Sequence, residues 1–239
     1  MQIYIVRHGD PDYEHDSLTP KGDADAKLLA ERLAKLNVTA FYCSPLGRAK
    51  RTASYTLEKT GRKAETLDWL REFEGRVPTH EGGHGCPWDR YPSYWTTVDA
   101  YYDYEKWDKV PLMAEYGVGD CYREVTEKLD AFLAGHGYVR EGRLYRAVRP
   151  NADVIVLFCH FGVESVILSH LFCISPVILW HNFRALTTSV THLVTEERED
   201  GIAQFVALRY GDLGHLDAAG EDPAFAARFC ERFTDDTRH

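Results

Sequence analysis

The segment Asp153–Cys159 is a short, almost wholly apolar run that ends directly at His160, and it constrains the fold more than any other part of the chain. A run of this length, rich in Val and Leu, is typical of a strand buried on both faces, as in the centre of a parallel sheet. Gln2–Val6 shows the same pattern and ends at charged residues. Two such strands with polar ends predict an α/β protein.

Strands and helices alternate along the rest of the chain. The first helix is expected to begin at Pro20 with Thr19 as its N-cap, because Ser and Thr cap helices and Pro suits the first helical position. This alternation predicts a three-layer α/β/α sandwich with a mostly parallel central sheet. The expected strands are Thr39–Cys43, Glu65–Leu70 (or an extended edge), and a final pair, Thr188–Glu196 with Gln204–Tyr210; the expected helices are Gly47–Lys59, Asp120–His136 and Val163–Phe172.

The segment from Gly75 to about Pro111 has a different composition. It is crowded with Gly, Pro, His, Trp and Tyr and shows no clear period. Because its tryptophans need burial, we interpret it as part of an inserted lid, about residues 75–150, and not as a linker. We therefore expect a single domain over residues 1–239 with this lid inserted.

Composition limits the partners and the compartment. The chain has 28 basic and 37 acidic residues, a net charge of −9, which argues against binding nucleic acid. Its six scattered cysteines are typical of a reducing cytoplasm, and neither a signal peptide nor a membrane-spanning run is seen, so we expect a cytoplasmic protein without a membrane partner. The lid residues His80, His84 and Cys86 fit no standard zinc spacing, and no metal is expected. No pattern predicts an oligomeric state.

Polar residues follow three of the predicted strands at their carboxyl ends, where α/β proteins bind ligands. Arg7-His8-Gly9 follows the first strand. His8 could be a nucleophile, a general base or a metal ligand, and Arg7 suits a phosphate or carboxylate. Gly9 allows a sharp turn and a close approach of ligand.

The other two strand ends add positive charge and a second imidazole. Arg48 falls in the first turn of a helix, where a cation is unfavourable unless an anion is bound, which suggests a phosphate site. Arg51, one turn further on, is more simply a solvated residue. A lone histidine beside an apolar run is usually a satisfied core residue, but His160 precedes Gly162 and a helix, the place of a catalytic group.

Together these motifs resemble the histidine phosphatase superfamily, also called the phosphoglycerate-mutase-like family. The resemblance rests on Arg7-His8-Gly9, the helix entry Leu18–Gly22, the segment Ser44–Ala53 and His160-Phe161-Gly162, in the family's order. R-H-G alone is a weak signal, whereas its combination with L-T-P-x-G and S-P-L-x-R-A-x-x-T-A is specific.

The resemblance implies a metal-independent, histidine acid-type phosphomonoesterase that needs no cofactor and acts on a small phosphorylated metabolite. His8 would form a phosphohistidine, and Arg7, Arg48 and His160 would stabilise the transferring phosphoryl group, with Gly9 and Phe161 also lining the substrate site. Glu72, in Leu70-Arg71-Glu72, matches the family's proton donor, and Glu74 is the alternative. The resemblance also leaves open a phosphoglycerate mutase, or a non-catalytic member that binds phosphorylated ligands or proteins.

The chain departs from the family pattern in its first loop. Many members carry an Asn and a Ser or Thr there, whereas this loop offers the carboxylates Asp10, Asp12 and Glu14, which would repel a second phosphate on a substrate. Asp10 or Asp12 could also supply the proton. The aromatic residues Trp88, Tyr91, Tyr94 and Trp95 of the lid suggest a substrate whose organic part is partly apolar or ring-shaped.

Overall fold

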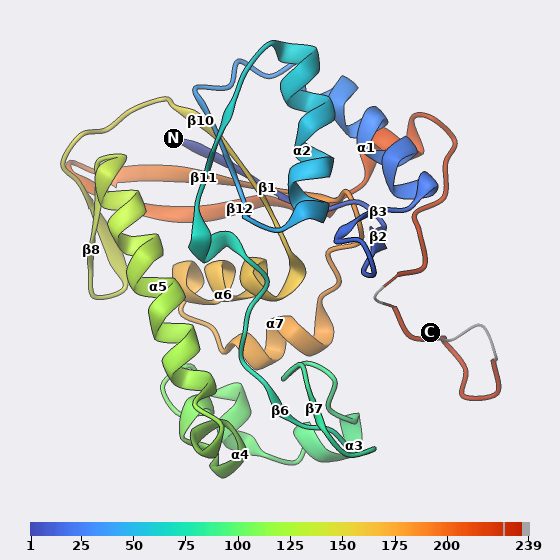
Figure 1. Ribbon diagram of the computed structural model, residues 1–239. Helices are drawn as coiled ribbons and strands as arrows, with labels where there is room; N and C mark the ends of the chain where they lie inside the picture. Colours follow the sequence, from blue (N-terminus) through green and yellow to red (C-terminus); the bar gives the residue numbers. More distant parts are fainter. Residues whose placement is uncertain (227, 236–239) are drawn as a thin grey trace.

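The computed structural model describes residues 1–226 and 228–235, and within them the chain forms one large mixed sheet with helices on both faces (Figure 1). The eight strands of this sheet lie in the order β5 (Ala64–Thr66), β4 (Ala40–Cys43), β10 (Val154–Cys159), β1 (Gln2–Arg7), β11 (Val190–Glu199), β12 (Ile202–Asp212), β9 (Leu144–Ala147) and β8 (Tyr138–Glu141). Two small hairpins stand apart from it: β2 (Pro11–Asp12) with β3 (Ser17–Leu18), and β6 (Val77–Pro78) with β7 (His84–Gly85).

The four strands from β5 to β1 run parallel, and the sheet continues beyond β1 with antiparallel pairs. The expected α/β class is confirmed, and the parallel strands form the half of the central sheet that ends at β5. The predicted pairing of the last two strands is confirmed too, as β11 and β12. The expected strand Glu65–Leu70 is shorter: β5 ends at Thr66, and a 3-10 turn covers Asp68–Leu70.

Strand β10 shows why its sequence is apolar throughout. Val156 and Phe158 pack into a cluster with α1 and α2, whereas Ile155, Leu157 and Cys159 pack into the cluster on the opposite face. Each of these five side chains is fully buried. A strand between two helical layers has no solvent face, so both sets of alternating side chains must be apolar.

The helices form the two outer layers. In Figure 1, α1 and α2 lie on one side of the sheet, and α5, α6 and α7 on the other. The Thr19 side chain accepts a hydrogen bond from the Gly22 amide at 3.1 Å, so the predicted cap of α1 is confirmed. The helices are α1 (Pro20–Leu33), α2 (Gly47–Thr60), α3 (Pro92–Trp95), α4 (Pro111–Glu115), α5 (Val118–Gly135), α6 (Phe161–Phe172), α7 (Pro176–Asn182) and α8 (Gly214–Asp217).

The segment between β5 and α5 packs beside α6 and α7. Trp95 and Trp107 are buried there, in a cluster that includes Trp180 of α7 and Phe161 of α6. The sequence missed the hairpin of β8 and β9, which falls inside the range expected for the lid yet extends the main sheet. Gly142, with φ of +62°, makes its turn.

None of the helices within the described residues is both long enough and apolar enough to cross a bilayer.

Candidate active site

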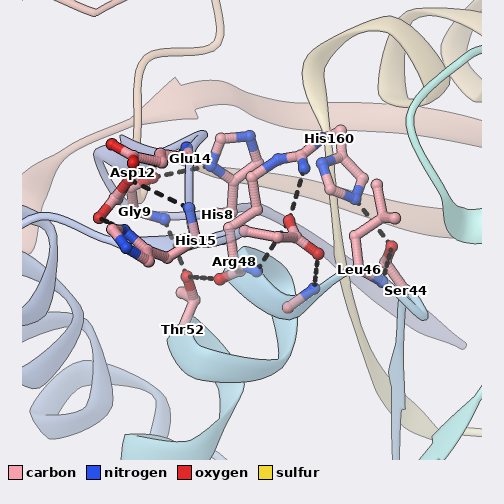
Figure 2. A network of polar contacts seen from close by, with 12 residues as sticks. His8, Gly9, Asp12, Glu14, His15, Ser44, Leu46, Arg48, Thr52 and His160 are labelled. Atoms are coloured by element: carbon pink, nitrogen blue, oxygen red, sulfur yellow. Dashed lines mark hydrogen bonds and ion pairs between the residues drawn. The ribbon is translucent and has the colours of Figure 1, made fainter.

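The carboxyl ends of three adjacent parallel strands meet at one edge of the sheet. His8 follows β1, His160 follows β10, and Ser44 follows β4. The register pairs Arg7 with Cys159, so the next residue of each strand is a histidine, and the two imidazole rings lie with centroids 5.0 Å apart. Figure 2 shows both rings close to Arg48, near the first turn of α2.

One ring nitrogen of His8 lies within hydrogen-bond distance of a backbone carbonyl, and this contact sets the tautomer of the ring. Its Nδ1 lies 2.7 Å from the Gly9 carbonyl oxygen. A carbonyl can only accept a hydrogen bond, so Nδ1 carries the proton and Nε2 keeps its lone pair. Burial, and then the charges of Arg7 and Arg48, hold the pKa of His8 well below its ordinary value. The buried imidazole is therefore neutral near pH 7, as a nucleophile must be.

His160 is also buried and also neutral. Its Nε2 lies 2.7 Å from Ser44 Oγ, whereas its Nδ1 has no hydrogen-bond partner among the described residues. Burial lowers the pKa of His160 well below its ordinary value, with smaller contributions from His8, Arg48 and Arg7. Ser44 thus fixes the ring and leaves one nitrogen for a ligand.

Arg7 is a buried cation beside these rings. Its side chain is 3% exposed, and Nη1 donates to the Ala185 carbonyl at 2.6 Å. Its guanidinium lies over the Phe161 ring, 5.8 Å from the centroid. Because arginine stays protonated in proteins, this position brings a full positive charge into the interior. An anion bound here would meet that charge with little screening by water.

Arg48 has a partner that sequence reasoning missed. Asp16 Oδ1 lies 2.8 Å from Arg48 Nη1, and Asp16 Oδ2 accepts a hydrogen bond from the Gly47 amide at 2.6 Å. The anion that the sequence indicated at the start of α2 is therefore supplied, in this structure, by a carboxylate of the chain itself. Asp16 reaches this position through a left-handed backbone, φ +44°, and a Cβ on Gly47 would collide with its carbonyl.

Glu72 lies beside the first turn of α6. Its Oε1 accepts hydrogen bonds from the amides of Phe73 at 2.8 Å and Val163 at 3.2 Å. Burial raises the pKa of this carboxyl, although both amides and the charges of Arg7 and Arg48 oppose the rise. A Cβ on Gly162 would come within 2.6 Å of Oε1 and would overlap Trp88, so only glycine fits there.

Glu74 and the first-loop carboxylates have other surroundings. Glu74 is 64% exposed and pairs with Arg71 at 2.9 Å. Asp10 accepts a hydrogen bond from the Thr19 hydroxyl at 2.7 Å, and Asp12 pairs with His15 at 2.8 Å. Four carboxylates were considered from the sequence as proton donors. Among them, Glu72 is the one that lies beside the N-terminus of α6, where the charges of Arg7 and Arg48 lower its pKa.

Gly9 and Phe161 have structural reasons for their residue types. A Cβ on Gly9 would lie 2.9 Å from the Gly22 carbonyl oxygen, so the close approach that requires glycine is to α1. Phe161 is buried, and its ring meets Trp88 edge-on at 5.8 Å as well as the guanidinium of Arg184 at 5.2 Å. The wall of the site beside α6 is therefore aromatic.

Comparison with known proteins places the chain in a family. Residues 3–207 match the family described as the histidine phosphatase superfamily, branch 1. A probable phosphoglycerate mutase GpmB of Serratia proteamaculans is 36% identical over 82 residues, and the chain spans 38% of that relative's length. A probable phosphoglycerate mutase GpmB of Salmonella arizonae is 35% identical over 236 residues, which cover 93% of this chain and 98% of that one.

A solved structure supports the same fold. A phosphoserine phosphatase mutant from Entamoeba histolytica, in complex with phosphoserine, superposes with a TM-score of 0.58 at 18% identity. The match covers 90% of this chain and 98% of the other. The histidine-phosphatase-like fold expected from the sequence motifs is confirmed.

The two buried imidazoles should stay neutral in solution at about pH 6, where a free histidine is largely protonated. We expect neutral rings because burial lowers both pKa values, and a histidine with a lowered pKa binds its second proton only at a lower pH than a free histidine does. Nitrogen chemical shifts from ¹⁵N-labelled protein should show neutral rings for His8 and His160, with Nδ1 of His8 protonated. Imidazolium signals from either residue at that pH would contradict the described burial.

Proposed function

The chain belongs to the histidine phosphatase superfamily, and on this premise we propose that it hydrolyses phosphomonoesters through a phosphohistidine on His8. The observation that carries the proposal is the state of His8. Its Nδ1–H donates to the Gly9 carbonyl, its ring lies 5.0 Å from that of His160, and the charges of Arg7 and Arg48 act on it. A nucleophile beside converging donors is the arrangement that phosphoryl transfer requires.

In the first step, His8 Nε2 attacks phosphorus in line as the ester P–O bond breaks. Arg7 and Arg48 stabilise the charge on the equatorial oxygens, and His160 donates a hydrogen bond to one of them. Glu72, whose pKa is raised by burial, gives its proton to the leaving oxygen. The products of this step are the free alcohol and a phosphohistidine.

In the second step, water attacks the phosphohistidine. The Glu72 carboxylate now takes a proton from the water, a P–O bond forms, and the P–N bond breaks. Inorganic phosphate leaves and His8 returns to its neutral form. The positive charge comes from arginines in this scheme, which is our reason for proposing a metal-independent, histidine acid-type phosphatase.

The substrate we propose is a small phosphorylated metabolite. Trp88 contacts the Phe161 ring and, like the proposed proton donor Glu72, lies against Gly162, so the organic part of the leaving group is proposed to contact aromatic rings. The whole chain is proposed to act as one domain. The segment from β6 to α4 serves in this proposal as the cover of the site, and β8 and β9 belong to the main sheet.

A phosphoglycerate mutase is the second candidate, favoured by one observation. The Salmonella relative named above carries that name and aligns with nearly the whole chain. The two candidates differ in the acceptor of the phosphohistidine, which is water in a phosphatase and a second phosphoglycerate hydroxyl in a mutase. Net release of inorganic phosphate as the main product favours the phosphatase, and interconversion of phosphoglycerates without release favours the mutase.

The proposal is tested by hydrolysis of an aryl phosphate with and without a chelator. We expect the wild-type rate to be unchanged by the chelator, and His8→Ala to lower kcat by at least about a thousandfold, since it removes the nucleophile. His15→Ala changes an exposed histidine and serves as the matched control, which should retain turnover. Activity that the chelator abolishes, or that survives in His8→Ala, would contradict the proposed mechanism.

The role proposed for Glu72 predicts a dependence on the leaving group. A general acid matters greatly for an alkyl ester and little for a good leaving group such as nitrophenolate. Glu72→Gln should therefore slow alkyl phosphates by about a hundredfold or more and nitrophenyl phosphate far less. The measurement is kcat for a series of esters of rising leaving-group acidity.

Glu74→Gln is the control for this series, because Glu74 is exposed and paired with Arg71. It should leave the dependence on the leaving group as in the wild type. Equal, small effects of the two substitutions would refute the role of Glu72 and favour Asp10 or Asp12 as the proton donor.

A further inference from the structure

Thr188 has a backbone conformation that threonine rarely adopts. Its φ is +60°, in the left-handed region, and it is the third residue of a turn that is closed by a hydrogen bond from the Ser189 amide to the Leu186 carbonyl at 3.0 Å. Glycine or asparagine usually occupies such a position, because a β-branched side chain crowds the backbone there. A strained residue of this kind persists only where its surroundings hold it, and such residues gather at functional sites.

This turn is bonded to the main chain of the proposed nucleophile. The Thr188 amide donates to the His8 carbonyl at 3.1 Å. The next residue of the turn, Ser189, accepts at its carbonyl from the Arg7 amide, also at 3.1 Å. The amide of His8 donates to the Cys159 carbonyl of β10 at 3.0 Å. Strand β10 therefore holds the amide of His8, and the strained turn holds its carbonyl.

The side chain of Thr188 is anchored in turn to the C-terminal helix α8. Its Oγ1 lies 2.7 Å from the Thr187 carbonyl oxygen and 3.1 Å from Nε2 of His215. A carbonyl can only accept, so the hydroxyl gives its one proton to Thr187 and accepts a hydrogen bond from His215. His215 is therefore protonated on Nε2. Burial lowers its pKa to about 4, so the ring is neutral near pH 7.

We propose that His215 and Thr188 are positioning residues for His8, and that threonine is retained in the strained turn because its hydroxyl ties the nucleophile to α8. The inference rests on the proposed function, in which His8 attacks phosphorus. A glycine at position 188 would relieve the strain, but it would have no hydroxyl for His215 to bind. The hydrogen bond from His215 restrains the turn, and the turn restrains the carbonyl of His8 and with it the direction of attack by Nε2.

A purely structural role would give a different result from the proposed one. If Thr188 served stability alone, its variants would lose stability and turnover together. If it serves the position of His8, a variant that relieves the strain keeps its stability and loses turnover. The loss follows because an error of about 1 Å in the place of a reacting group can cost about a hundredfold in rate.

The first experiment compares two substitutions in the same turn. Thr188→Gly should keep Tm within about 4 °C of wild type, since the relief of strain offsets the lost hydroxyl contacts, and should lower kcat for nitrophenyl phosphate by about tenfold or more. Thr187→Val is the matched control, because the buried Oγ1 of Thr187 has no hydrogen-bond partner among the described residues. It should keep both Tm and kcat.

The second experiment changes only the donor to Thr188. His215→Leu removes this donor and should lower kcat by about tenfold. His215→Gln can place an amide N–H near the position of Nε2 and should recover most of the rate. Nitrogen chemical shifts of the wild type should show His215 protonated on Nε2. This pair of variants decides the question if Thr188→Gly does not fold.

Two anions distinguish the position of His8 from the binding of charge. Orthovanadate can bond to the attacking nitrogen and therefore reports on its alignment, whereas sulfate reports on the groups that bind a dianion. In Thr188→Gly and His215→Leu, the inhibition constant of vanadate should rise by about tenfold, and that of sulfate should change by less than about threefold.

The outcomes separate the inference from the proposed function. Wild-type turnover and vanadate inhibition in Thr188→Gly or His215→Leu overturn the inference and leave the proposed phosphatase intact. Equal weakening of sulfate and vanadate, or no recovery in His215→Gln, also overturns it. If the wild type neither hydrolyses phosphomonoesters nor binds vanadate, the proposed function fails, and the inference fails with it.

Discussion

The parallel pairing of β1 with β10 is the constraint on which the rest of the site depends. Its register sets Arg7 opposite Cys159, so the next residue on each strand is a histidine at the same sheet edge. The pairing is stable because β10 is apolar on both faces and packs against helices on each side. A shift by one residue would turn these side chains to the wrong faces and separate His8 from His160.

Burial then sets the charges at that edge. It depresses the pKa of both histidines well below the ordinary value, so two neutral imidazoles lie beside two arginines near pH 7, and it raises the pKa of Glu72. Nucleophilic attack requires a neutral imidazole, and a raised carboxyl pKa favours general acid catalysis. The chain's net negative charge does not prevent this, because the local field of the site comes from Arg7 and Arg48.

The sequence predicted the residues of the site better than their partners. Strand ends could be read from apolar runs, because periodicity and burial are local signals, and so His8 and His160 were found. Asp16 was missed because its contact with Arg48 depends on a left-handed backbone and on a loop meeting the first turn of α2, which no local pattern encodes. Likewise, Glu72 and Glu74 are only two positions apart in the sequence. Glu72 reaches the site and Glu74 stays exposed because of the path that the chain takes after β5.

The measurement that tests the mechanism most directly is the position of phosphorus on the trapped enzyme. The protein would be mixed with a phosphomonoester, quenched in base to preserve an acid-labile phosphohistidine, and analysed by peptide mapping and by ³¹P and ¹⁵N NMR. Because Nδ1 of His8 donates its proton to the Gly9 carbonyl, the phosphoryl group is expected on Nε2 of His8. Phosphorus on Nδ1 of His8, or on His160, would contradict the mechanism.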